Sequence, residues 1–309
     1  MTSKRHFLKT ALLLLLALAG TTAAHAADGL YTLKCGERTM TVDAAHGGKI
    51  LSLKYGDTEV LSQSRFPESF GSTFWTSPQK EWNWPPVAEF DKQAYTVEQA
   101  EPATDATATT LLRIRSQVSA RLGFSIGKTF RADAKSGTFT ITYTIKNEGS
   151  EARRVAPWEI SRVPNGESTI FFQAENDKVW PDGLLSFQPA QKAVWYKPDE
   201  APQNRKVNAD GKGWLAYCAN GLLLLKTFPD MKAGEEAPGE AEIQVYVNRG
   251  KTYIELESQG AYTLLQPGQE LSWTVGWHLL PVNEKTQAPK KLIKKILKIK
   301  KAQKELLPP

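Results

Sequence analysis

Short runs of apolar and β-branched residues, separated by turn-forming residues, recur along most of the chain. In the clearest run, residues 138–145 (TFTITYTI), aromatic and aliphatic side chains alternate with threonines. A period of two is typical of a strand with one buried face. Comparable runs occupy residues 49–55, 110–118, 221–228, 242–247, 252–257 and 271–280. Many short strands predict an all-β fold, a large antiparallel sandwich or barrel.

Three stretches interrupt this pattern and are expected to be loops. They are residues 62–92, 164–193 and 198–213, and the first contains the sequence GSTFWTSPQKEWNWPP. Long irregular loops in a compact domain commonly carry function, because a rigid sheet holds them in place. No segment before residue 285 has a convincing helical pattern.

The last segment, residues 285–309, differs from the rest in composition. Five apolar residues are spaced to form one stripe on a helix otherwise rich in lysine: Leu292, Ile293, Ile296, Leu297 and Ile299. Such a helix could lie on an anionic membrane surface. The alternative that we favour is a helix docked on the domain, with its lysines in solvent.

The first 26 residues have the layout of a secretory signal. A basic start is followed by an apolar run at residues 11–19 and by Ala24-His25-Ala26, which predicts cleavage after Ala26 and a periplasmic or secreted protein. The apolar run is about half of what a membrane span requires. We therefore expect a signal peptide at 1–26, one β domain at 27–284 and a lysine-rich tail or helix at 285–309.

The formal charge of +6 is concentrated at the two ends of the chain. The first 26 residues carry three positive charges, and residues 290–305 carry eight lysines and one glutamate, which leaves about −4 for the body. Nucleic-acid binding by the folded domain is not expected, since it requires a basic face. Export would allow a disulfide between Cys35 and Cys218; two buried free thiols are the alternative.

Several kinds of chemistry lack the residues that they need. After the signal segment only His46 and His278 remain, and the Gly-x-Ser-x-Gly motif of serine hydrolases does not occur. Neither His-x-x-x-His nor Cys-x-x-Cys spacing is found, nor a phosphate-binding glycine loop. We therefore expect no metal and no cofactor.

Tryptophans next to charged residues point to a different kind of site. Indole faces stack on the C–H face of a pyranose ring, and carboxylate or guanidinium groups hydrogen-bond its hydroxyls. The alternative is that each ring simply packs in the core. The candidates are Trp75, Trp82, Trp84 and Trp158 for stacking and Lys80, Glu81, Glu159 and Arg162 for polar contacts.

The order of several motifs resembles the aldose 1-epimerases and other galactose mutarotase-like proteins, closest to a group of uncharacterised secreted bacterial proteins. The motifs are HGGKILSL (46–53), GDTEVL (56–61), TITYTIKN (140–147), YIELESQ (253–259) and LQPGQE (265–270). The resemblance covers roughly residues 30–280. It implies a β-supersandwich with a sugar-binding groove on its concave face.

The resemblance also implies where catalysis would occur. In mutarotases a glutamate base and a histidine acid open the sugar ring from opposite sides. The base falls on Glu257, with Glu255 on the same side of its strand, and Glu159 stands where the histidine is expected. A carboxyl acts as an acid near neutral pH only if its pKa is raised. We interpret His278 and His46 as structural.

Three functions remain open. We favour a monomeric periplasmic protein that binds a mono- or oligosaccharide through the tryptophans and carboxylates. The first alternative is an epimerase or sugar lyase with Glu257 as base and Glu159 or a tyrosine as acid. The second is an envelope module that binds a protein partner through its loop tryptophans, with peripheral membrane contact through the lysine-rich tail.

Overall fold

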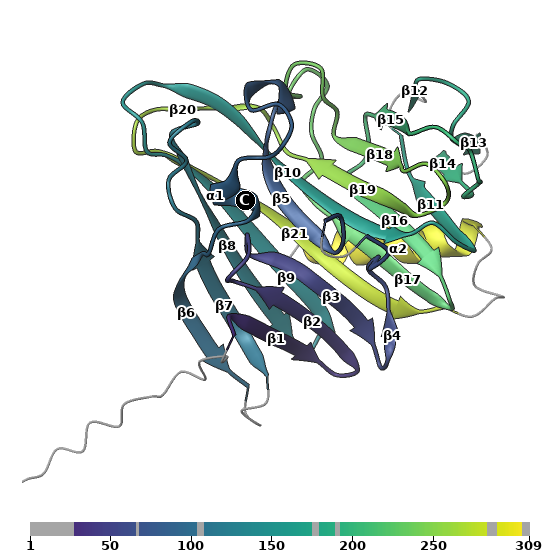
Figure 1. Cartoon of the computed structure of the whole chain (residues 1–309). Helices are drawn as coiled ribbons and strands as arrows, with labels where there is room; N and C mark the ends of the chain where they lie inside the picture. The colour runs from purple at the N-terminus through teal and green to yellow at the C-terminus, as the bar shows by residue number, and fades with distance from the viewer. Residues whose placement is uncertain are drawn as a thin grey trace, which may run out of the picture.

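The computed structural model describes residues 28–65, 68–103, 108–174, 179–188, 192–282 and 289–304. The predicted signal segment and its cleavage site lie outside these ranges. Within them, nearly all regular structure is antiparallel β-sheet, in two layers (Figure 1). This confirms the expected all-β fold.

In the described part of the chain, one layer consists of ten strands, each hydrogen-bonded to the next, with β6 at one edge and β13 at the other. Its strands, in spatial order, are β6 (Thr96–Pro102), β7 (Thr109–Arg115), β8 (Phe124–Asp133), β9 (Thr138–Asn147), β21 (Glu270–Pro281), β17 (Leu222–Thr227), β16 (Trp214–Ala219), β11 (Ser168–Phe172), β14 (Ala193–Tyr196) and β13 (Ser186–Gln188). The strand that the sequence predicted most clearly, 138–145, lies in β9 at the centre of this layer.

The other layer contains the strands that form the candidate site. Its order is β1 (Leu30–Cys35), β2 (Arg38–Asp43), β3 (Lys49–Tyr55), β5 (Ser72–Ser77), β10 (Arg153–Pro164), β19 (Tyr253–Gln259), β18 (Ile243–Val247), β15 (Arg205–Ala209) and β12 (Val179–Trp180). The short strands β4 (Thr58–Glu59) and β20 (Thr263–Leu265) pair with β3 and β10. A single parallel pair, Leu33 with Thr109, joins β1 to β7.

The expected loops contain more structure than the sequence indicated. β5 lies inside 62–92, β11 and β13 lie inside 164–193, and β15 lies inside 198–213. All six residues of β5 are buried, so its sequence shows no alternation of polar and apolar positions and was wrongly expected to be irregular. Two short helical turns, η1 (Gln79–Glu81) and α1 (Ala88–Asp91), follow it.

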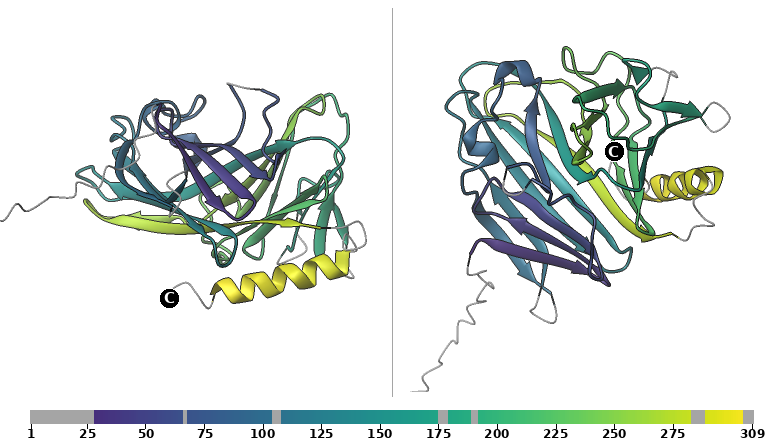
Figure 2. Two further views of the ribbon diagram at one scale, coloured as in Figure 1. Left: turned by 90° about the horizontal axis from the view of Figure 1, so that it is seen from below. Right: turned by 45° about the vertical axis from the view of Figure 1, so that its right-hand side comes forward.

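The C-terminal segment forms helix α2 (Pro289–Lys304), docked on the β domain. Leu292, Ile293 and Ile296 are buried in the common hydrophobic core. The helix lies on the side of the molecule away from β1–β3 (Figure 2). Of the two arrangements that the sequence left open, the structure therefore shows the docked one.

Cys35 and Cys218 are both buried and free, so the structure contains the pair of unbridged thiols. In the described ranges, every helix is too short or too polar to cross a lipid bilayer.

Candidate functional site

Alternation along β10 places its neighbouring side chains on opposite faces of the sheet. Trp158 and Arg162 project from the outer face, and Glu159 projects toward the other layer. On the adjacent strand β19, Glu257 lies opposite Ile160 and Glu255 lies opposite Arg162. Glu255 and Glu257 therefore share the outer face with Trp158. The structure does not bring Glu159 and Glu257 together around one substrate, because the sheet separates them.

Glu159 is fully buried between the layers. Its Oε1 accepts hydrogen bonds from Tyr143 Oη at 2.7 Å and Trp277 Nε1 at 3.0 Å, and its Oε2 lies 2.6 Å from Lys226 Nζ in an ion pair that is also fully buried. Burial lowers the pKa of Lys226, and the charge of Glu159 opposes that shift. These contacts make Glu159 an interior structural charge.

Glu257 is buried on the outer face, beneath a tryptophan and a lysine. Its Oε2 accepts hydrogen bonds from Trp158 Nε1 at 2.9 Å and from Lys206 Nζ at 3.1 Å, and its Oε1 has no hydrogen-bond partner among the described residues. Burial raises the pKa of Glu257 to about 7, although Lys206 lowers it in part. This carboxyl can gain or lose a proton near neutral pH.

The four candidate tryptophans form one cluster with different exposures. Trp75, on β5, meets Trp82, Trp84 and Trp158 edge to face, with ring centroids 5.5, 6.0 and 5.6 Å apart. Trp75, Trp82 and Trp158 are buried, and Trp82 Nε1 donates to the Thr76 carbonyl at 2.8 Å. Trp84 is 68% exposed. Trp84 is thus the most exposed ring of the cluster, and Trp75 packs against it with Trp82 and Trp158 behind.

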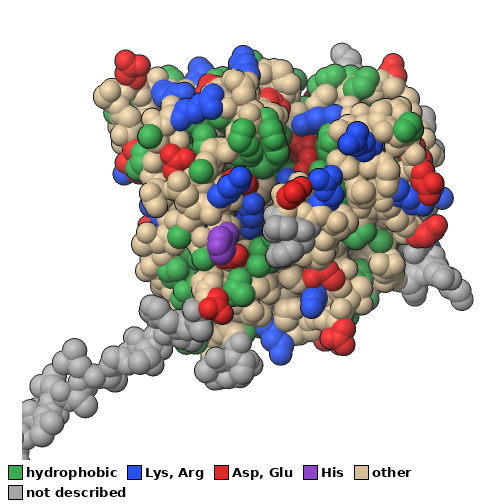
Figure 3. Space-filling view, viewed as in Figure 1, with side chains coloured by type: hydrophobic (Ala, Val, Ile, Leu, Met, Phe, Trp, Pro, Cys, Tyr) green, Lys and Arg blue, Asp and Glu red, His purple; other side chains and the backbone are tan. Residues whose placement is uncertain are grey.

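A cavity of about 930 Å³ opens beside this cluster. Trp75, Trp84 and Arg162 line it, whereas Lys80 and Glu81 do not; Glu81 instead pairs with Arg153 at 3.1 Å. The space-filling view shows acidic, basic and hydrophobic side chains around a hollow on the face seen in Figure 1 (Figure 3). The volume lies within the range of small-molecule sites.

Asp91 is the central polar group of this cavity. Its Oδ1 accepts from Trp75 Nε1 at 3.0 Å and Thr73 Oγ1 at 3.1 Å, and its Oδ2 lies 3.2 Å from Lys49 Nζ. Burial raises the pKa of Asp91, but the charge of Lys49 and the bond from Trp75 outweigh it, so the pKa lies below its ordinary value. Asp91 is therefore an ionised acceptor at the cavity wall.

The charges around the cavity balance one another. Four lining residues are cationic and four carry a carboxylate: Lys49, Arg65, Lys92 and Arg162; Asp28, Asp43, Glu68 and Asp91. Several are paired, as in Lys49 with Asp91, and Arg162 also contacts Glu255 outside the lining, with Nε and Oε1 2.9 Å apart. Fixed donors and acceptors without net charge suit the hydroxyl groups of a neutral polar molecule.

The sequence did not single out Asp91 or Lys49, which meet only through the fold. A useful signal was His46-Gly47-Gly48, because this turn carries the chain past Asp91. Gly47 and Gly48 both have positive φ. Buried Lys128 donates from Nζ to both of their carbonyls, at 2.8 and 3.0 Å, and burial lowers the pKa of Lys128 to about 7. The buried Lys128 side chain thus fixes the position of this turn through two hydrogen bonds.

The two histidines have different surroundings. His278 is buried, with its ring nitrogens 3.2 Å from the hydroxyls of Thr138 and Thr227, so it is a structural residue. His46 is exposed at the cavity, and its Nδ1 lies 2.8 Å from Asp43 Oδ2.

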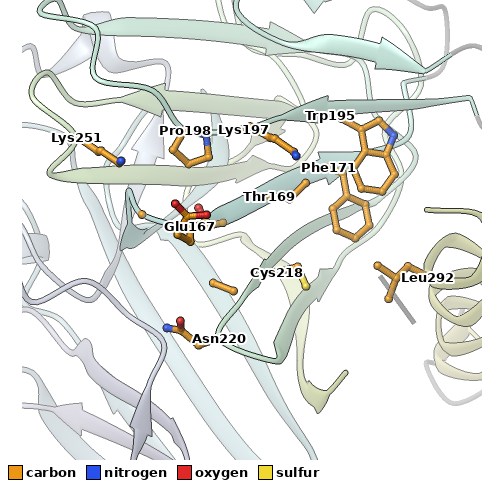
Figure 4. Close-up of a pocket in the computed structure, with 13 residues that line it drawn as sticks. Glu167, Thr169, Phe171, Trp195, Lys197, Pro198, Cys218, Asn220, Lys251 and Leu292 are labelled. Atoms are coloured by element: carbon orange, nitrogen blue, oxygen red, sulfur yellow. The ribbon is translucent and has the colours of Figure 1, made fainter. Parts of the chain in front are cut away.

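A second cavity of about 500 Å³ lies at the other end of the domain, beside α2 (Figure 4). Trp195 stacks on Phe171 at its wall, with ring centroids 4.3 Å apart, and Leu292 of α2 reaches the same wall. None of the sequence-predicted site residues lines it. Within the described ranges, no group of three or more His, Cys, Asp or Glu side chains could hold a metal ion.

Comparisons with solved structures identify the fold. An aldose epimerase homologue from C. elegans superposes with a TM-score of 0.55 at 11% identity, covering 83% of this chain and 100% of that one. Galactose mutarotase-like proteins from Clostridium acetobutylicum and Lactobacillus casei superpose with TM-scores of 0.54 and 0.53, each at 11% identity; they cover 81% and 82% of this chain and 95% and 100% of their own. No family model and no curated protein matches the sequence.

Proposed function

We propose that this chain, which has the galactose mutarotase-like fold, is a periplasmic carbohydrate-binding protein. The sugar occupies the cavity beside Trp84, with its apolar face against the indole and its hydroxyls directed to Asp91, Lys49 and Arg162. The observation that carries the proposal is the charge-balanced cavity next to an exposed tryptophan. Stacking and paired polar groups are the usual combination for a pyranose ring.

The charge balance favours a neutral sugar over an acidic one. Three of the four lining cations, Lys49, Arg65 and Arg162, are already paired with neighbouring carboxylates, as in Lys49–Asp91 and Arg162–Glu255. An anionic ligand would have to compete with these contacts, whereas a hydroxyl can donate to Asp91 and accept from Lys49 simultaneously.

The test compares two exposed tryptophans by calorimetric titration with a panel of neutral and acidic mono- and oligosaccharides. Trp84 is 68% exposed at the cavity, and Trp180 is 43% exposed on β12, outside the lining. We expect Trp84→Ala to weaken binding about tenfold, in line with the loss of one aromatic contact, and Trp180→Ala to leave it unchanged. A panel without any saturable binding, or equal effects of the two substitutions, would contradict the proposal.

A second candidate function, aldose epimerisation, is favoured by one observation. Glu257 has a pKa raised to about 7 and an Oε1 without a partner among the described residues, which are properties of a general base. It does not line the cavity, however, and Glu159 cannot act as its acid from the other face. NMR exchange between anomers tests the idea: acceleration lost in Glu257→Gln would support catalysis, and exchange at the buffer rate would exclude it.

The location in the periplasm is tested separately. If residues 1–26 are a signal peptide, protein recovered from the periplasmic fraction begins at Ala27, which intact-mass measurement detects. A full-length chain in the cytosolic fraction would contradict the export part of the proposal and leave sugar binding to be judged on its own test.

A further inference from the structure

Helix α2 buries its apolar stripe and leaves a strongly cationic outer face. Leu292, Ile293 and Ile296 pack into the domain, and the side chains between them point to solvent. Six exposed lysines result: Lys290, Lys291, Lys294, Lys295, Lys298 and Lys301. This set of lysines, called here the lysine face, occupies barely three turns of helix.

The domain does not neutralise the lysine face. None of its six lysines forms an ion pair with a carboxylate in the part of the chain that the structure describes, and Pro289–Lys304 contains no acidic residue. Like charges four residues apart, such as Lys290 and Lys294, repel each other along the helix. Ordinary solubilising helices intersperse both signs of charge, so this pattern calls for an anionic partner.

Two features favour a lipid surface as that partner. Leu297 is 42% exposed among the lysines, and an apolar side chain within a cationic helix face inserts at the headgroup boundary of a bilayer. In addition, α2 lies lengthwise on the outside of the molecule, on the side opposite the face that carries the 930 Å³ cavity (Figures 1 and 2). A flat membrane can therefore meet the lysine face while the cavity remains open to solvent.

We propose that the lysine face of α2 docks this protein on an anionic phospholipid surface. The contact is peripheral and mainly electrostatic, because the main apolar stripe is already committed to the core and only Leu297 remains for the lipid. Docking orients the candidate sugar site away from the membrane. The lysine face is separate from the candidate sugar site, and docking does not require sugar binding.

The experiment measures co-sedimentation of the chain from residue 27 onward with two kinds of vesicle. One is phosphatidylcholine containing about one-third phosphatidylglycerol, and the other is pure phosphatidylcholine. The signal segment is left out, because its apolar run would bind lipid by itself. A triple variant, Lys294→Gln, Lys295→Gln and Lys298→Gln, is compared with Lys34→Gln, Lys54→Gln and Lys135→Gln, which removes three exposed lysines of the β domain. Circular dichroism checks that both fold.

We expect the native chain to bind the anionic vesicles only, and less as salt increases. Each lysine near an anionic surface raises the affinity for that surface roughly fivefold, so the α2 triple variant should bind on the order of 100-fold more weakly. The control triple variant should bind as the native chain does. Leu297→Gln should also weaken binding, whereas Leu264→Gln, 44% exposed on β20, should not.

Three results would overturn the assignment. The first is no binding of the native chain to anionic vesicles, and the second is equal loss in the two triple variants. The third is displacement from the vesicles by duplex DNA at lower concentrations than competing anionic lipid, which would make the lysine face a nucleic-acid surface instead.

Discussion

Glu159 and Glu257 project from adjacent strands, yet they have opposite environments. The first faces the other layer, where Lys226, Tyr143 and Trp277 surround it. The second faces outward, under Trp158 and Lys206. The difference follows from the pairing of the two strands. Glu159 lies opposite Ser258, so it shares a face with Ser258, and Glu257, the next residue along the strand, points to the other face. One carboxyl is therefore a paired interior charge and the other is a titrating group near the candidate site.

Replacing only one partner of the buried ion pair Glu159–Lys226 should destabilise the fold strongly. Lys226→Met leaves an uncompensated carboxylate in the interior, and we expect the free energy of unfolding to fall by about 3–5 kcal/mol. The double variant with Glu159→Gln should recover much of that loss. Lys146→Met removes an exposed ion pair with Glu148 and should cost less than about 1 kcal/mol. Urea denaturation measures all three; equal losses for Lys226→Met and Lys146→Met would contradict the argument.

Stability should decrease with rising pH between about 5 and 7. The pKa of Glu257 is raised from 4.5 to about 7, and that of Glu242 to about 8, in both cases first by burial. In this window the two carboxyls bind more protons in the native state than in the unfolded state, so the free energy of unfolding falls as pH rises. Lys128, whose pKa burial lowers to about 7, opposes this trend as pH approaches 7. Glu257→Gln should make the free energy of unfolding less dependent on pH below 7. The change in free energy across the window should become smaller by at most about 3 kcal/mol. Urea midpoints across this range provide the measurement, and an unchanged slope in the variant would show that Glu257 does not titrate there.

At the scale of elements, the turn between β2 and β3 determines where the cavity wall lies. Gly47 has a φ of +73°, and a Cβ placed there would lie 2.3 Å from the Asp91 carbonyl oxygen. The Gly47 amide also donates to the Gln93 carbonyl at 2.9 Å. Only glycine allows this close approach, which brings α1 and the side chain of Asp91 against β5.

Substituting the glycine of this turn should disturb both stability and the site. Gly47→Ala is expected to cost about 2–4 kcal/mol, because it combines backbone strain with a clash against α1, and to weaken any sugar binding through Asp91. Gly56→Ala is the control: its φ is +56°, but no atom of the described residues lies within 4 Å of the added Cβ, so about 1 kcal/mol is expected. Thermal and urea denaturation give the comparison, and similar losses at the two glycines would contradict the role of the contact with Asp91.

At the scale of the whole molecule, two layers enclose a core that needs no covalent cross-link. Cys35 and Cys218 are buried and unbridged, and α2 adds its apolar stripe to the same core. A domain of this size buries enough apolar surface to be stable without disulfides.

The two thiols should accordingly be protected in the native protein and reactive after unfolding. Burial raises the pKa of Cys35 to about 11 and also raises that of Cys218, and the thiolate is the reactive form. Labelling with a thiol reagent at pH 8 should be slow without denaturant and should reach two groups in urea without any reductant. A requirement for reductant would reveal a disulfide, and rapid native labelling would show that the thiols are accessible.

The strands that could be predicted from sequence were those with an alternating pattern or a continuous apolar run, such as 221–228, which contains β17. The run at 138–145 alternates and lies in β9, whereas β5 is buried on both faces and could not be distinguished from a loop. In the site, Trp75 and Arg162 are brought to the cavity, but Lys80 and Glu81 are not. Lys80 and Glu81 lie in η1, and no periodic pattern in the sequence predicts the direction of such a turn.

The sequence by itself determined that the chain is a β protein and which side chains share a strand face, because period two is a local property of the backbone. It also contained the glycines that the turn at Gly47 requires. Only the tertiary structure decided that β10 lies between β5 and β19, and therefore that Glu159 meets Lys226 inside while Asp91 meets Lys49 and Trp75 at the cavity. Those contacts join residues far apart in the chain, and their register arises from packing the two layers together.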